Sequence, residues 1–157
     1  MSSILLTPYA GVFGASPLPE IHEYWRVKGV TAGSFVGGAL AELEFRATIG
    51  GADQATGGTS ISGSEFNGSL VDGNAFDDDG STAWAGTSLA LSWVGYQFTS
   101  PVSVEEISIT SREASNGAQT WVDFDLEYSD DGSAWTTHWN ILSSTWGNAE
   151  TRTFTAP

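Results

Sequence analysis

The sequence predicts an all-β domain, built as an antiparallel sandwich or barrel. Several stretches alternate apolar and polar residues with a period of two, the pattern of strands that bury one face. Turn-forming residues separate these stretches, and no stretch shows a convincing helical pattern. At 157 residues the chain is long enough to bury the core of one such domain.

The first 22 residues differ from the rest, because they hold three of the five prolines and little periodicity. This predicts an extended N-terminal arm at 1–22, followed by a β-sandwich domain at 23–157. The arm carries more apolar residues than a solvated tail usually does, so we expect it to dock on the domain or on a partner. A disordered tail is the alternative. The apolar residues are Ile4, Leu5, Leu6, Tyr9, Val12 and Phe13.

Strands are predicted from alternating apolar and polar positions in order along the chain. They lie at 24–28, 42–47, 91–98, 102–111, 121–129, 135–142 and 151–155. The pattern is strongest at 121–129, where apolar residues alternate with Asp123, Asp125 and Glu127. Turns are predicted at Ser100-Pro101 and at 130–133, where a second Asp-Asp-Gly sequence closes a hairpin. The glycine-rich stretches 31–38 and 49–69 are predicted to be loops.

Charge and composition exclude several classes of function. The chain carries 19 acidic and 5 basic residues, so a net charge of −14 would repel nucleic acid and anionic lipid. No predicted loop has a cluster of apolar residues for membrane insertion, and no stretch approaches the roughly 20 apolar residues of a membrane-spanning helix. The absence of cysteine excludes disulfides, thiolate-bound zinc and a thiol nucleophile. The start of the sequence has no basic region, so we predict no signal peptide.

No enzyme is predicted, because the sequence lacks the motifs G-x-S-x-G, H-E-x-x-H and the phosphate-binding P-loop. A glycosidase needs only two carboxylates at a set separation, so the many acidic residues leave that possibility open. An acidic loop and solvated strand faces account for these residues more simply. We therefore expect a non-catalytic protein.

An acidic loop at 71–84, VDGNAFDDDGSTAW, is the densest cluster of potential metal ligands. Asp77 and Asp79 lie two residues apart and Thr82 three further on, so a tight turn could direct their oxygens at one hard cation. Calcium prefers six to eight such oxygens. An acidic surface turn is the alternative interpretation, since Asp, Gly and Ser are ordinary turn residues. An EF-hand loop is excluded, because it would need glycine at Thr82 and glutamate at Ser88.

Three segments, NAFDDDGSTAW, ISITSR and VDFDLEYSDDGSAWTT, together resemble the discoidin or coagulation-factor type C domain family. The resemblance covers roughly 64–155 and implies a galactose-binding-like jelly roll. The upstream block from YWRV to AELEFRATIGGAD resembles the opening of discoidin-like proteins of tailed bacteriophages. This second resemblance implies a virion protein.

The family resemblance also implies a structural calcium ion, because many sugar-binding members hold one between this loop and the last strand. Matched by position, the ligands here would be carbonyl oxygens and acidic or hydroxyl side chains. They are the Asn74 carbonyl, Asp77, Asp79, Thr82, the Ala149 carbonyl and Glu150.

A ligand-binding surface is implied at the same end, formed by an arginine, amides and an aromatic platform. Matched by position, its residues are Arg112, Glu113, Asn116, Gln119 and, as the platform, Trp146. Galactose-binding relatives often carry a histidine where this chain has Ala85-Gly86-Thr87, and His22 and His138 are expected to be surface residues instead. The family framework positions match Trp84, Trp93, Trp121 and Trp135, which we expect in the core.

Two functions follow as hypotheses. The first is a glycan-binding module without catalysis, which contacts host surface polysaccharide as part of a phage decoration or fibre protein and gains avidity from multiple copies. The second is a purely structural virion protein that uses the fold without binding sugar. In both, the arm at 1–23 would contact other virion subunits, and the protein would be made in the host cytoplasm and released by lysis. This context depends on resemblance alone.

Overall fold

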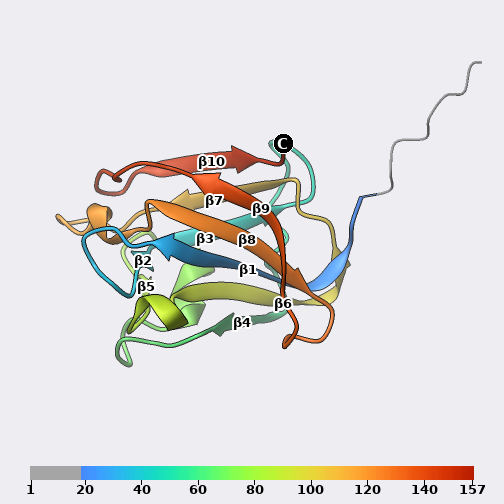
Figure 1. Cartoon of the computed structure of the whole chain (residues 1–157), viewed down its shortest axis with the longest axis horizontal. Coiled ribbons are helices and arrows are strands. Elements are labelled where there is room, and N and C mark those ends of the chain that lie inside the picture. The colour runs from blue at the N-terminus through green and yellow to red at the C-terminus, as the bar shows by residue number, and fades with distance from the viewer. Residues whose placement is uncertain (1–18) are drawn as a thin grey trace, which may run out of the picture.

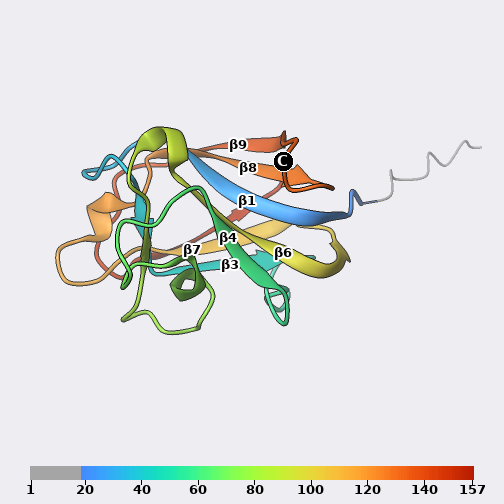
Figure 2. The ribbon, with the colours of Figure 1, turned by 90° about the horizontal axis from the view of Figure 1, so that it is seen from below.

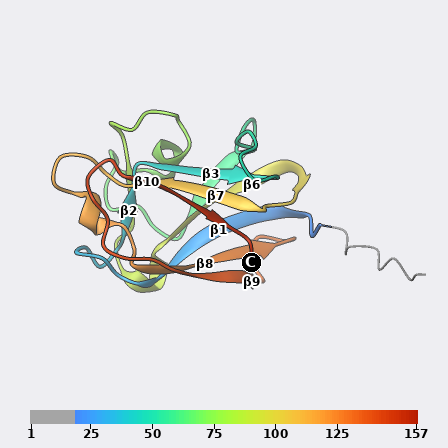
Figure 3. The ribbon, with the colours of Figure 1, turned by 90° about the horizontal axis from the view of Figure 1, so that it is seen from above.

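The computed structural model describes residues 19–157, which form two antiparallel β-sheets packed face to face (Figure 1). One sheet has five strands in the order β4-β6-β1-β8-β9, and the other has three in the order β10-β7-β3. A short pair, β2-β5, lies beside them. Views along the sheets show the two layers (Figures 2 and 3). The expected all-β sandwich is confirmed.

The strands follow one another along the chain with three short 3₁₀ turns between them. The first strands are β1 (His22–Thr31), β2 (Ala39–Leu40), β3 (Glu42–Arg46), β4 (Thr59–Ser62) and β5 (Trp84–Ala85). The later strands are β6 (Trp93–Val102), β7 (Glu106–Thr110), β8 (Asp123–Ser129), β9 (Thr136–Leu142) and β10 (Thr151–Thr155). The 3₁₀ turns are η1 (Asp72–Ala75), η2 (Leu89–Leu91) and η3 (Gly117–Gln119). Within 19–157 there is no α-helix, and so none that could cross a membrane.

The core fills the space between the sheets with the apolar residues that the alternation predicted. On the central strand β1, Trp25 and Val27 are fully buried, and on β8 Phe124 and Leu126 are too. Leu43 and Phe45 of β3 face them from the other sheet. The period of two in the sequence therefore corresponds to one core face and one outer face on each strand.

One predicted turn and part of one predicted loop are strands in the structure. The turn expected at Ser100-Pro101 is wrong, because β6 continues through these residues to Val102. Pro101 is tolerated because the ladder between β1 and β6 is irregular there, with a register shift between His22 and Tyr24. The predicted loop 49–69 contains β4, an edge strand that pairs only with β6 within the described sheet.

The predicted arm lies outside the described residues, except for its last four, and His22 already belongs to β1. Within the domain, four connections gather at one end of the sandwich, where β1, β7 and β9 end and β3 and β10 begin (Figure 1, left). They are 32–38, 63–92, 111–122 and 143–150, and we call this the loop end. All the predicted ligand residues lie there.

Candidate functional site

The acidic loop gathers oxygen atoms around the hydroxyl of Thr82. Thr82 Oγ1 lies 2.9 Å from Asp77 Oδ2, 3.0 Å from the Asp79 carbonyl oxygen and 3.4 Å from the Asn74 carbonyl oxygen. A hydroxyl has one proton and can donate to one of these acceptors at a time. The oxygens therefore outnumber the donors that reach them, and such a set of carboxylate, carbonyl and hydroxyl oxygens suits a hard cation.

The loop is held in this shape by its own backbone and by Asn74. The Asn74 amide donates to the carbonyl oxygens of Ser69, at 3.0 Å, and Ala83, at 2.9 Å, which closes the base of the loop. Thr82 N–H donates to the Asp79 carbonyl at 2.9 Å. The Asp79 carboxylate accepts hydrogen bonds from the N–H and hydroxyl of Ser81, and these lower its pKa. These hydrogen bonds therefore favour the ionised form of Asp79.

Glu42, at the start of β3, completes this cluster and was not predicted from the sequence. Its Oε1 atom is buried and has no hydrogen-bond partner among the described residues. Burial, together with the neighbouring Asp77, raises the pKa of Glu42 to about 7. Two carboxylates that face each other with a buried, unpartnered oxygen are destabilising unless a proton or a cation lies between them. The residues present therefore fit a divalent cation.

The structure does not bring Ala149 and Glu150 to this loop. Glu150 Oε1 accepts a hydrogen bond from Arg152 at 2.7 Å and its Oε2 accepts one from Gly147 N–H at 2.6 Å, and these contacts lower its pKa. The register places Thr151 and Glu42 on opposite sides of Thr110 in the three-stranded sheet. Of the two glutamates, Glu42 is the one beside Asp77, and the assignment of Ala149 and Glu150 as ligands stays a prediction.

No set of three or more acidic, histidine or cysteine side chains within 19–157 is arranged to hold a metal by side chains alone. A cation in this loop would therefore depend on the carbonyl oxygens of Asn74 and Asp79 and the hydroxyl of Thr82, as well as on carboxylates. Such mixed oxygen ligands are what calcium accepts and what zinc, with its preference for nitrogen and sulfur, does not.

Arg112 and two amide side chains form a polar network on the connection between β7 and β8. Arg112 Nη1 donates to Gln119 Oε1 at 2.8 Å, and Gln119 Nε2 donates to Asn116 Oδ1 at 3.1 Å. This is the only side-chain contact of the guanidinium within the described residues, so its other N–H groups are available to a ligand. Three of the predicted ligand residues are thus brought together, and Glu113 is exposed on the same loop.

This loop is fixed by tight packing against the connection before β10. Gly117 N–H donates to Asn148 Oδ1 at 3.0 Å, and a Cβ atom at Gly117 would lie 1.7 Å from the Gly147 carbonyl oxygen. Ala114 and Ser115 both have positive φ angles, of 52° and 69°, which is uncommon for residues with a side chain. Backbone strain of this kind persists where the surroundings impose it, and it clusters at functional sites.

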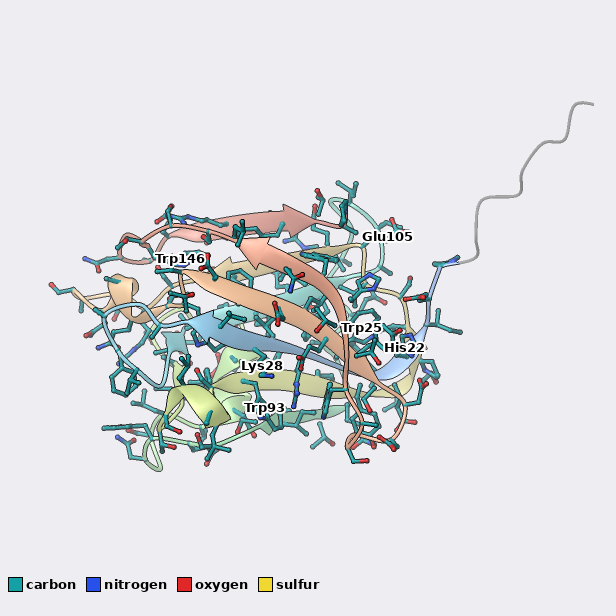
Figure 4. The ribbon with its side chains drawn as sticks, viewed as in Figure 1. His22, Trp25, Lys28, Trp93, Glu105 and Trp146 are labelled. Atoms are coloured by element: carbon teal, nitrogen blue, oxygen red, sulfur yellow. The ribbon has the colours of Figure 1, made fainter. Side chains whose placement is uncertain are left out.

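Trp146 is not an exposed platform. Its side chain is only 3% exposed, its Nε1 donates to the Trp121 carbonyl at 2.8 Å, and Arg152 covers its ring at 4.4 Å. Figure 4 shows it at the loop end, among the strands. The prediction that Trp146 offers its face to a ligand is therefore wrong, because local sequence does not reveal that Arg152 and Phe154 enclose it.

A partly exposed aromatic pair lies on loops at the same end, one of which is joined to the loop of the arginine network. The rings of Phe35 and Phe66 meet edge to face at 5.4 Å, and Phe66 is 52% exposed. Ser34 N–H donates to the Ala118 carbonyl at 2.6 Å, which joins the loop of Phe35 to the loop of the amides. The pair is formed by residues 31 positions apart on two different loops, so no single stretch of the sequence reveals it. Exposed Val36 enlarges it.

The tryptophans matched to the family framework differ in burial, and none of them is exposed. Trp84 and Trp121 are fully buried, as expected, whereas Trp93 and Trp135 are half-buried and enclose the guanidinium of Arg26. In Figure 4, Trp93 lies near Lys28 on the five-stranded sheet, and His22 lies at the opposite end from Trp146.

His22 stacks on Tyr128 at 3.6 Å, and its Nδ1 lies 2.7 Å from Asp130 Oδ1. His138 is also half-buried, and burial lowers its pKa. Neither histidine belongs to the loop end.

The sandwich of five and three strands, with polar and aromatic loops at one end, defines a binding module of the jelly-roll class. Comparison with protein-family models identifies the F5/8 type C domain over residues 55–157, about two thirds of the chain. The chain belongs to this family, whose members are non-catalytic binding modules. Comparisons with curated proteins and with solved structures give no match.

Proposed function

We propose that the chain is a glycan-binding module whose site is the surface formed by Arg112, Asn116, Gln119, Phe35 and Phe66. The observation that carries this proposal is the backbone hydrogen bond from Ser34 to Ala118, which joins the loop of the phenylalanine pair to the loop of the arginine network. An arginine fork and neighbouring amides can hydrogen-bond adjacent sugar hydroxyls. A phenylalanine face can pack against the apolar side of a pyranose ring.

We further propose that a structural calcium ion stabilises this end of the domain. Asn74 and Asp79 would contribute carbonyl oxygens, Thr82 its hydroxyl, and Asp77 and Glu42 their carboxylates. Bound there, calcium supplies positive charge that neutralises the facing carboxylates. The chain's own part is to fasten the loop to the first residue of β3, close to the glycan surface.

A shallow loop surface of this size binds a single sugar weakly, so the module would act in multiple copies. A phage decoration or fibre protein meets that condition, and the block at 24–53 supports this context by its resemblance to phage discoidin-like proteins. In that setting the ligand would be host surface polysaccharide. A purely structural virion protein is the competing function, and the following experiment separates the two.

The test is binding to a glycan array and to whole bacterial cells, with calcium and with chelator. Arg112→Ala should weaken binding by about 10- to 100-fold, because a charged hydrogen bond contributes roughly 1.5–3 kcal/mol. Phe66→Ala should also weaken it, whereas both variants keep the wild-type melting temperature. Lys28→Ala and Ile21→Ala are the matched controls, since they remove a partly exposed cation, paired with Glu127, and an exposed apolar residue elsewhere.

Retained binding in Arg112→Ala would contradict the assigned surface. If the folded wild-type protein binds neither the glycans nor the cells, the purely structural function is favoured. Binding to lipid vesicles instead would show that the phenylalanine pair inserts into membranes rather than packing on sugar.

A further inference from the structure

The sandwich has an open side between β9 and β10. β9 is the last strand of the five-stranded sheet and β10 is the last strand of the three-stranded sheet, and the two lie side by side (Figures 1 and 3). A groove of about 370 Å³ separates them. Among the described residues, neither strand has a pairing partner on this side. Each therefore presents unpaired backbone N–H and C=O groups along the groove.

The groove is apolar at its base and uncharged throughout. Trp139, Ile141 and Phe154 line its floor, and Leu142 at its rim is 82% exposed, the highest value among the large apolar side chains described. Every residue that lines it is uncharged, in a chain with a net charge of −14. An open apolar edge of this kind is a site for strand addition or aggregation unless it is covered.

The chain enters the described structure at the mouth of this groove. Glu20 Oε2 lies 3.5 Å from His138 Nδ1, and His138 immediately precedes the groove residue Trp139 on β9. Pro157, the last residue, lines the same groove. The segment that precedes Glu20 therefore starts beside the open edges.

Length and composition of that segment fit the groove. Residues 1–19 contain no Asp, Glu, Lys, Arg or His, which matches the uncharged lining. They include Ile4, Leu5, Leu6, Tyr9, Val12 and Phe13, the apolar residues that such a floor would bury. The stretch of β9 from Trp139 to Leu142 needs about 13 Å of extended chain, whereas 18 residues can reach about 60 Å.

We propose that the segment 4–13 of the same chain docks in the groove between β9 and β10 and pairs with one of these strand edges. The added strand would satisfy backbone groups of the open edge and cover Leu142 and Phe154. This is strand addition within one molecule, in which main-chain hydrogen bonds give affinity and alternate side chains give register. The proposal is independent of the glycan site, which lies at the loop end.

The chain contains no cysteine, so disulfide trapping in the full-length protein tests the proposal directly. Leu142→Cys is combined in turn with Ile4→Cys, Leu6→Cys, Tyr9→Cys and Val12→Cys, because the register is unknown. We expect at least one pair to form an intramolecular disulfide under mild oxidation. The matched control pairs the same four positions with Leu91→Cys, an exposed apolar residue near the other edge of the five-stranded sheet.

Hydrogen exchange gives a second, independent measurement. In the full chain we expect slow exchange at amides of β9 or β10, and the double change Leu5→Asp and Leu6→Asp should speed it by at least tenfold. Leu142→Asp should have the same effect and Leu91→Asp none. The proposal would be overturned if disulfides form equally well with Leu91→Cys. It would also be overturned if the changes Leu5→Asp and Leu6→Asp leave the exchange rates of β9 and β10 unaltered. Disulfide-linked dimers would overturn docking within one chain and show exchange of arms between copies.

Discussion

The two Asp-Asp-Gly sequences of this chain, at 78–80 and 130–132, are alike in composition and differ in what their carboxylates contact. Asp131 accepts hydrogen bonds from the N–H groups of Ser133 and Ala134, both at 2.8 Å, and from the Ser129 hydroxyl. These bonds hold its pKa well below the usual range. The turn at 130–132 is thus satisfied by its own backbone.

In the loop at 78–80, Asp79 is satisfied in a similar way by Ser81, and the difference lies at the preceding residue. Asp77 faces Glu42, whose pKa is raised, and the oxygens around Thr82 outnumber the protons available to them. Glu42, a residue of β3 that is distant in sequence from the loop, makes the difference. An acidic turn therefore becomes a candidate cation site when another carboxylate faces it, and not through its own sequence.

The largest expected difference between the two turns is their response to calcium. If calcium binds the loop at about 100 times its dissociation constant, it adds about 2.7 kcal/mol of stability. For a chain of this size that raises the melting temperature by about 5–10 °C. Asp77→Asn and Glu42→Gln should each abolish the rise, while Asp131→Asn should leave it intact. Melting followed by circular dichroism in calcium and in chelator measures the effect.

Magnesium at equal concentration is the control for a nonspecific charge effect, since it demands a smaller, stricter octahedron. A rise that survives in Glu42→Gln but disappears in Glu150→Gln would show that the ligand lies on the far side of β7. If the melting temperature is the same in calcium and in chelator, the proposal that this loop binds calcium is wrong.

Much of the fold was predictable because strand burial is a local property. The alternation in 121–129 and 151–155 predicted β8 and β10, and the hairpin turn at 130–133 was placed correctly. Pro101 misled the prediction because a register shift in the β1–β6 ladder, invisible in sequence, accommodates it.

The candidate site was harder to predict, because its contacts join residues far apart in sequence. Arg112, Asn116 and Gln119 share one loop, so their grouping could be anticipated. Glu42 alternates with buried Leu43 and lies on the other face of β3, yet its Oε1 atom is buried there. The identity of the neighbour on that face, Asp77, is set only by how the loop folds back.

A smaller difference is expected from the glycines that close the two turns. Gly132 has φ of +69°, and a Cβ atom there would lie 3.0 Å from the Tyr24 ring. Gly80 is not among the glycines with positive φ, and a Cβ atom there would have no neighbour within 4 Å. Gly132→Ala should therefore destabilise the fold by about 1–2 kcal/mol, and Gly80→Ala by no more than about 0.5 kcal/mol.

Urea denaturation of the two alanine variants in chelator measures this difference without any contribution from calcium. Equal losses would show that the loop at 78–80 is as constrained as the hairpin. In that case the loop would already be rigid without a cation.

The smallest expected effect is the pH dependence of the Asp131 turn. Because its hydrogen bonds lower the folded-state pKa, ionised Asp131 stabilises the fold above the pKa of an unfolded aspartate, about 3.9, and loses that contribution as the pH falls further. At pH 7 the melting temperature of Asp131→Ala should therefore be lower than that of the wild type, by less than the decrease expected for Gly132→Ala. This difference in melting temperature should disappear as the pH falls toward 2. Glu105→Ala is the control, since the Glu105 side chain is exposed and makes no hydrogen bond within the described residues. A difference that stays constant down to pH 2 would mean that Asp131 acts through its shape in the turn, and then the charge contrast between the two acidic turns would depend on Glu42 alone.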